Sequence, residues 1–356
     1  IWFPQLQLAV NNLLWPALFN VFAIRGEEYR DPRILLRGLD ELAALDAEHL
    51  IGAHGPPLSN QAEVKKRILD QRDAIQFLWD QTVRCANRGL TLNEIIAAIQ
   101  LPAHFRQHYT SQQFYGVVEH HVRQIYTGLF GWFDEDEANL FPVPAPERSK
   151  RLIEGFGGIT AVREAVDVAL DSADYRWAIE LASWLVRSDL NAQGRADAGA
   201  PEDRQRLSSA LRGVAYSTTS ANLRNWCLTR ALELDGSNSL ERFRGHRFHK
   251  RELARRPATE SVRLLKVLLR PELAGELEQT LAICFTEGGV TGLTIRHGVA
   301  VPGDGQTAAL SLTVSSEHWF DILAGKLKLS QALSDGAIQT ADPDGTKAFF
   351  GCFDLE

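Results

Sequence analysis

The sequence contains no methionine in 356 residues and only four cysteines. A chain of this length normally carries several methionines, so we expect either a fragment of a longer protein or a sequence from which modified methionines have been lost. Cys85, Cys227, Cys284 and Cys352 are widely separated and form no Cys-x-x-Cys pair. This spacing disfavours a cysteine zinc site or a disulfide framework and favours buried apolar thiols.

Long apolar runs and an excess of positive charge are also missing. No apolar run reaches the roughly 18 residues needed to cross a bilayer, so we expect no integral membrane span. The net charge of −7 and the pI near 5.9 give no general basic surface, so nucleic acid is not an expected partner. Localisation stays open, because a signal peptide could have been lost with a missing N-terminus.

The first part of the chain reads as the closing αβ unit of a layered sheet. A strand-like segment over 1–10 is followed by an amphipathic helix over 31–47, which begins at Asp31-Pro32. A short apolar strand then ends in Gly52-Ala53-His54-Gly55-Pro56, which places His54 where a loop can present it to a pocket. Neutral imidazole is a common zinc ligand, although a lone histidine after a strand is more often an ordinary loop residue.

The middle of the chain is strongly helical. Apolar residues recur at helical spacing in seven segments, namely 62–88, 92–99, 115–130, 161–170, 177–186, 201–215 and 221–234. The pattern over 174–187 and 202–216 predicts a helical hairpin. We expect Trp177, Trp184 and Trp226 to lie in the core of this region. His120 and His121 are adjacent, so they point in different directions on a helix, and a structural role is expected for both.

The last hundred residues change periodicity. A helix beginning near Pro257 precedes strand-like runs at 279–286, 292–296 and 308–314, and two further helices are predicted at 316–324 and 329–334. Helices and antiparallel strands in this order predict an α+β domain. The chain as a whole is therefore expected to be a multi-domain α+β protein.

Several separated motifs, in one order along the chain, resemble those of a known family, the alkyl sulfatases of the metallo-β-lactamase superfamily. The motifs are Phe3-Pro4-Gln5-Leu6, Ile24-Arg25-Gly26, Ala53-His54-Gly55-Pro56, Phe114-Tyr115-Gly116, Gly131-Trp132-Phe133-Asp134 and Asp174-Tyr175-Arg176-Trp177-Ala178. The resemblance implies three parts. Residues 1–58 would be the terminal part of a metallo-β-lactamase αββα sandwich, 59–255 an all-α dimerisation domain, and 256–356 a domain like sterol carrier protein type 2.

The resemblance also implies two Zn²⁺ ions per full-length chain and a homodimer. The superfamily's His-x-His-x-Asp-His motif, which supplies most of the zinc ligands, occurs nowhere in these 356 residues. The chain alone is therefore not expected to assemble the zinc site, and its catalytic residues stay unassigned. Asn11-Asn12 stand where the superfamily usually has an acidic ligand. Either the metal site is altered, since an amide is a weaker ligand than a carboxylate, or the asparagines only form a turn.

By the same resemblance, His54 is expected to be a metal ligand, and Arg25 and Tyr115 are expected to bind substrate. The Arg25 guanidinium suits a sulfate oxyanion, with an ion pair to Asp31 or Glu27 as the alternative. The Tyr115 hydroxyl can donate to a sulfate oxygen, with a packing role as the alternative.

The implied function is zinc-dependent hydrolysis of alkyl sulfate esters to an alcohol and inorganic sulfate. Two alternatives stay open, namely another hydrolase of the same superfamily and a non-catalytic dimeric protein that binds lipid or surfactant. The sequence does not distinguish primary from secondary esters, set the length of the alkyl chain, or choose between C–O and S–O cleavage.

Overall fold

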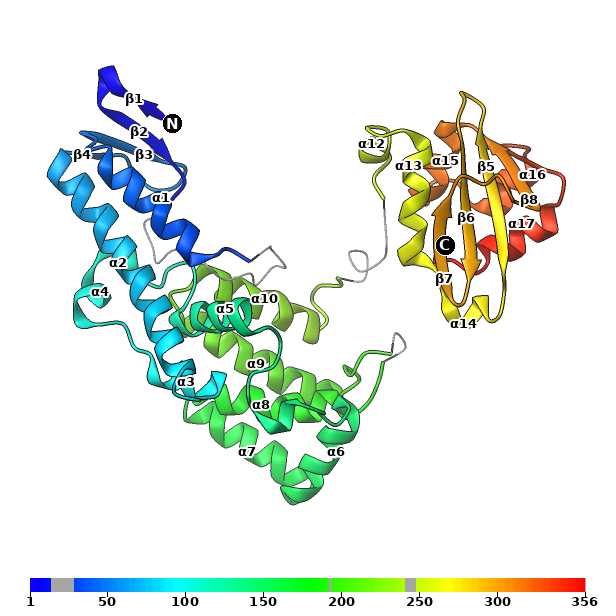
Figure 1. Ribbon diagram of the computed structural model, residues 1–356. Helices are drawn as coiled ribbons and strands as arrows, with labels where there is room; N and C mark the ends of the chain where they lie inside the picture. Colours follow the sequence, from blue (N-terminus) through cyan, green and yellow to red (C-terminus); the bar gives the residue numbers. More distant parts are fainter. Residues whose placement is uncertain (14–28, 192–193, 241–247, 356) are drawn as a thin grey trace. The chain divides into compact units, whose positions relative to one another are not determined.

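The computed structural model describes residues 1–13, 29–191, 194–240 and 248–355. The chain divides into two compact units, Ile1–Asn238 and Ser239–Glu356, each with its own elements (Figure 1). Within the described ranges, no helix combines the length and the apolarity needed to cross a bilayer. The domain boundaries expected at 58/59 and 255/256 stay predictions.

The first unit opens with a four-stranded sheet in the order β1-β2-β3-β4. The strands are β1 (Trp2–Phe3), β2 (Leu8–Asn11), β3 (His49–Gly52) and β4 (Leu58–Ser59). β2 and β3 are parallel, with Leu8 opposite His49, while both outer pairs are antiparallel. The predicted strand over 1–10 is broken by a 3₁₀ turn, η1 (Pro4–Leu6), because proline at its start fixes φ and removes a backbone donor.

Helix α1 (Pro32–Ala44) confirms the predicted helix and its start. Pro32 occupies the first turn, and the Asp31 side chain accepts a hydrogen bond from the Arg33 backbone N–H at 2.9 Å. Leu39 and Leu42 are buried on the face that meets helix α2 (Gln61–Ala86), which runs beside α1 (Figure 1).

The helical region confirms the seven predicted helical segments. Its further elements are α3 (Leu92–Ala98), α4 (Ala103–Gln107), η2 (Tyr109–Ser111), α5 (Val118–Phe130), η3 (Glu137–Asn139), α6 (Ala145–Gly155), α7 (Ile159–Asp171), α8 (Tyr175–Arg187), α9 (Pro201–Ser217) and α10 (Ala221–Leu234). The predicted hairpin is formed by α8 and α9, which bury Leu181, Leu185, Leu207 and Leu211 in one core cluster. Helices α4 and α6 were not predicted, because α4 is short and α6 is rich in charge.

Two of the three tryptophans expected in this core lie outside it. Trp184 is half-buried, but Trp177 and Trp226 are exposed. The buried stripe of α10 is Cys227, Ala231 and Leu234, and Trp226 lies about 100° away from it around the helix. Trp177 packs its ring edge-on against Trp184 at the rim, with centroids 6.1 Å apart. The prediction was therefore wrong for Trp177 and Trp226.

The second unit is an α+β domain, as predicted. Its five strands, in the sheet order β7-β6-β5-β8-β9, are β5 (Gln279–Phe285), β6 (Val290–Arg296), β7 (Val299–Gly303), β8 (Leu310–Val314) and β9 (Ile338–Thr340). β5 and β8 are parallel, and the other pairs are antiparallel. The helices are α12 (Lys250–Leu253), α13 (Ala258–Ser261), η4 (Val262–Leu268), α14 (Pro271–Ala274), α15 (Ser316–Leu323), α16 (Leu329–Ser334) and α17 (Pro343–Phe350).

Aromatic residues fill the core of the second unit. Trp319, Phe349 and Phe350 are buried together, and the Trp319 ring N–H donates to Ser261 Oγ at 2.8 Å. This bond satisfies the indole donor inside an apolar core, which an unpaired donor would destabilise.

Candidate functional site

His54 lies at the edge of the first sheet where two parallel strands end. Asn11, the last residue of β2, pairs with Gly52, the last residue of β3. The Ala53 backbone N–H donates to the Asn11 carbonyl at 3.0 Å, and His54 follows directly with an exposed side chain. The position matches the expectation that a loop after the strand presents this imidazole.

The contacts of Asn11 are those of a turn. Its side-chain oxygen accepts the Leu13 backbone N–H at 2.8 Å, and its amide nitrogen donates to the Ile51 carbonyl at 3.3 Å. The first bond closes a turn directly after β2, and the second ties the end of β2 to its neighbour β3. These contacts favour the turn-forming role for Asn11 over a role as a metal ligand. Asn11 and Asn12 also line a pocket that holds one carboxylate, Glu41.

This sheet edge alone does not complete a zinc site. A catalytic zinc needs three protein ligands, and structural zinc needs four. The described residues that meet here offer one imidazole, His54, together with two amides. The donor set fits a single ligand position, so the other ligands of any zinc ion bound by His54 would have to come from elsewhere.

Tyr115 lies in the loop before α5, and its backbone is held by the start of α10. Ser220 Oγ donates to the Tyr115 carbonyl at 2.7 Å, and the Ala221 backbone N–H donates to the Phe114 carbonyl at 2.8 Å. The Tyr115 side chain is half-buried. Arg25 lies outside the described residues, so its proximity to Tyr115 and His54 stays a prediction.

The adjacent histidines of α5 have different surroundings. His121 is fully buried, and this burial lowers its pKa to about 3, so the imidazole is neutral at physiological pH. Burial also lowers the pKa of His120, against the opposing effect of Glu119. Glu119 forms an ion pair with Arg176 of α8 at 2.5 Å. These surroundings fit a structural role for His121.

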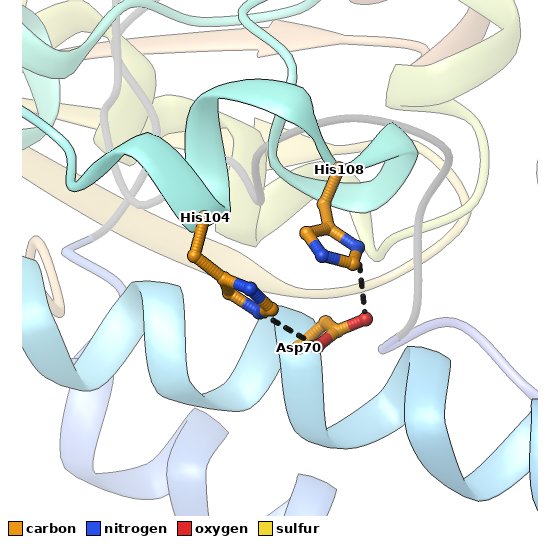
Figure 2. Close-up of side chains that lie close together, drawn as sticks. All are labelled: Asp70, His104 and His108. Carbon is orange, nitrogen blue, oxygen red and sulfur yellow. Dashed lines mark hydrogen bonds and ion pairs between the residues drawn. The ribbon is translucent and has the colours of Figure 1, made fainter.

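A compact group of possible metal ligands, which was not predicted, consists of Asp70 on α2, His104 in α4 and His108 directly after α4 (Figure 2). The indication was present in the sequence, because His104 and His108 are four residues apart, a spacing that puts two imidazoles on one helical face. Asp70 could not be found this way, since it comes from a different helix.

Comparison with known proteins identifies the family. Residues 91–237 match the family described as alkyl sulfatase dimerisation. Over 96% of its length the chain is 33% identical to a linear primary-alkylsulfatase of a Pseudomonas strain, of which it covers 65%. By these matches the chain corresponds to the C-terminal portion of an alkyl sulfatase. It is also 31% identical, over 99% of its length, to an (R)-specific secondary-alkylsulfatase of Pseudomonas, of which it covers 53%.

A solved structure of an alkyl sulfatase supports the same assignment. A double mutant of the sec-alkyl sulfatase PisA1 superposes with a TM-score of 0.82 and 29% identity, over 99% of this chain and 56% of that one. The predicted multi-domain α+β fold with a helical dimerisation domain is thereby confirmed, and the assignment of residues 1–58 to the end of a hydrolase domain stays a prediction. The chain spans about half to two-thirds of the length of these alkyl sulfatases.

Proposed function

We propose that the gene product to which this chain belongs hydrolyses alkyl sulfate esters to an alcohol and inorganic sulfate. The observation that carries the proposal is the similarity, over nearly the whole chain, to proteins named as primary and secondary alkylsulfatases. Because both kinds are matched at similar identity, the proposal covers the ester class and not one position of the sulfate.

Three residues of this chain have proposed roles. His54 supplies one imidazole to zinc, as its place at the sheet edge allows, and zinc when bound supplies a water activated at neutral pH. Arg25 and Tyr115 donate hydrogen bonds to the sulfate oxygens and so stabilise the negative charge of the sulfate group. Both donors serve the anion whichever ester bond breaks.

We also propose that the protein is a homodimer. The chain carries the dimerisation domain of the family over residues 91–237. Large apolar side chains are exposed between the end of α5 and the start of α6, where such residues favour contact with another protein surface. They are Leu129, Phe130, Trp132, Leu140, Phe141 and Val143.

A second candidate function is a dimer that binds amphiphiles without hydrolysing them. It is favoured by the turn contacts of Asn11, which stands where the superfamily usually has an acidic ligand. In this case the helical and C-terminal domains would hold alkyl compounds, and zinc would not be needed.

Zinc content and sulfate release on the intact gene product test the two candidates together. We expect about two zinc ions per full-length chain at the hydrolase site, and release of inorganic sulfate from dodecyl sulfate. His54→Ala should lower zinc content and activity together. Arg25→Lys and Tyr115→Phe should keep zinc and lower activity, because each removes donors to the sulfate.

His49→Ala is the matched control, since His49 is an exposed histidine on β3 that contacts Ser59 Oγ at 2.9 Å. This variant should keep both zinc and activity. No turnover by the intact protein, with a zinc content that His54→Ala leaves unchanged, would refute the enzyme and leave the amphiphile-binding dimer as the better account.

A further inference from the structure

Asp70, His104 and His108 form a side-chain cluster between α2 and α4. His104 Nε2 lies 3.2 Å from Asp70 Oδ1, and His108 Nδ1 lies 3.0 Å from Asp70 Oδ2. Figure 2 shows both imidazoles turned toward the same carboxylate. One ligand atom from each residue lies within 4.8 Å of the other two. The cluster does not include His54.

These separations are close to those of a bound metal. Ligand atoms around a tetrahedral zinc, each about 2.1 Å from the ion, are roughly 3.4 Å apart. The two separations above are slightly shorter than this, but they run to different oxygens of Asp70, and one ligand atom from each residue lies only within 4.8 Å of the others, so the side chains would rotate to surround an ion. A pair of histidines four residues apart with a carboxylate from another helix is a common donor set for zinc and similar ions.

The backbone that carries the two histidines is held in place. Phe105, between them, packs its ring against Phe77 of α2 with centroids 6.3 Å apart. Ser111 Oγ donates to the Phe105 carbonyl at 2.6 Å, and the Gln112 amide donates to the His108 carbonyl at 3.0 Å. The segment after α4 therefore folds back on the helix, and the imidazoles are positioned before any ion arrives.

The protonation states suit a metal ion. Burial alone would raise the pKa of Asp70, but hydrogen bonds from Lys66 and His104 outweigh it, and the net pKa lies below its usual value. Burial lowers the pKa of His108, against the attraction of Asp70, and the nearby Lys66 and His104 lower it further. An ionised carboxylate and a neutral imidazole are the forms that bind a metal.

We propose that Asp70, His104 and His108 bind a divalent transition-metal ion of the zinc class, which ties α4 to α2. The Asp70 side chain is only 10% exposed, whereas that of His104 is 56% exposed. The ion therefore has protein ligands on its inner side and open positions for water on its outer side. Its role is structural, because it joins two elements distant in sequence.

Lys66 gives the proposal a sharp test. Its ammonium lies 2.6 Å from Asp70 Oδ2 and occupies a place at the carboxylate that a cation would take. Half of the Lys66 side chain is exposed, so it can swing into solvent. The Lys66 ammonium and a metal ion would compete for the Asp70 carboxylate, so removing the ammonium should strengthen metal binding. Without a metal ion, the same change would only remove an ion pair from the cluster.

The experiment uses the 356-residue chain after removal of metals with a chelator. ZnCl₂ is titrated by calorimetry, and CoCl₂ by visible absorption, which reports ligand geometry directly. We expect one ion at this cluster and at least about tenfold weaker binding in His108→Ala and in His104→Ala. Lys66→Gln should bind about fivefold more tightly.

Lys65→Gln is the matched control. Lys65 is the neighbour of Lys66 on α2, and its ammonium pairs with Asp46 at 2.6 Å, away from the cluster. Lys65→Gln removes the same charge as Lys66→Gln and should leave the affinity of the cluster for zinc unchanged. His54→Ala should also leave this affinity unchanged, which separates the cluster from the zinc ligand of the proposed function.

Two results would overturn the proposal. One is zinc or cobalt binding that both histidine variants leave unaltered, with the variants folded by circular dichroism. The other is equal affinity in Lys66→Gln and Lys65→Gln, which would mean that no ion reaches Asp70. Because neither result involves sulfate release, failure here leaves the proposed hydrolase untouched.

Discussion

At the scale of single residues, His121 shows how burial changes a titration. The imidazole lies on the buried face of α5 with Val118, Val122 and Ile125, and its pKa falls from 6.5 to about 3. In the unfolded chain the same imidazole titrates at its ordinary value. Between these two pKa values the unfolded state binds more protons than the folded state, so stability must fall as the pH falls.

We expect His121 to lower the free energy of unfolding of the first unit by about 2 kcal/mol between pH 7.5 and pH 5. His121→Leu should lose this part of the pH dependence, whatever its stability at neutral pH. Chemical denaturation of both proteins at the two pH values measures the difference. His297→Leu, which changes an exposed histidine of the second unit, should keep the wild-type dependence. Parallel pH profiles for wild type and His121→Leu would contradict the expectation.

Cysteine shows the same effect of burial. Cys85, Cys227 and Cys352 are buried, as the scattered positions suggested, while Cys284 is half-buried. Burial raises the pKa of Cys227 to about 11, so this thiol is not a nucleophile at neutral pH.

The burial of a side chain could be predicted from the sequence where its position on the apolar face of a helix determines it. His121 falls four residues before Ile125 on the apolar stripe, so its burial could have been derived from periodicity. The exposure of Trp177 could not, because a large apolar residue at the edge of a stripe fits the core and the rim equally well. The helical periodicity of α2 predicts only on which side of that helix Asp70 lies, and nothing in the sequence indicates that it is close to His104.

At the scale of elements, α8 and α9 approach closely at one glycine. Gly213 of α9 faces the Tyr175 ring, and a methyl group added at Gly213 would lie 2.3 Å from ring carbons. A methyl carbon does not approach a ring carbon this closely in proteins, so either the Tyr175 ring or helix α9 would have to move. Tyr175 begins α8, so the movement would disturb the start of the hairpin.

Gly213→Ala should therefore destabilise the first unit by about 1 to 3 kcal/mol, although alanine is the better helix former. Denaturant unfolding followed by tryptophan fluorescence measures the change. Gly155→Ala is the control, since no atom lies within 4 Å of a methyl group added there at the end of α6. It should be neutral or stabilising. If Gly213→Ala also proved neutral, the close approach of the two helices would be refuted.

Elements with a clear period were predicted nearly to their ends, and those without one were missed. The predicted segment 221–234 became α10 with the same limits, because Ser220 caps it and accepts a hydrogen bond from Leu223. β9 has only three residues, and β7 ends in Val301-Pro302-Gly303, so neither gives a strand pattern. Both lie at sheet edges, where a strand is defined by its neighbour's hydrogen bonds.

At the scale of the whole molecule, the exposed apolar residues between α5 and α6 carry the dimer prediction. Trp132 is 74% exposed and Phe141 is 89% exposed, both inside the dimerisation domain. Light scattering at micromolar concentration should give twice the chain mass of 39.7 kDa, and Phe141→Asp should lower it toward one chain mass. Val267→Asp, at an exposed position of the second unit, should stay dimeric. A wild-type mass of one chain would rule the dimer out.

The two units draw on separate sets of buried residues. The core cluster of the second unit runs from Leu253 to Phe353, and those of the first unit lie between Ala9 and Leu234. We therefore expect the two units to melt in separate transitions, so that no single melting temperature describes the chain. We expect a substitution that disrupts the core of one unit to leave the other unit folded and resistant to proteases. Damage of this kind would show as a stable fragment rather than as loss of the whole chain.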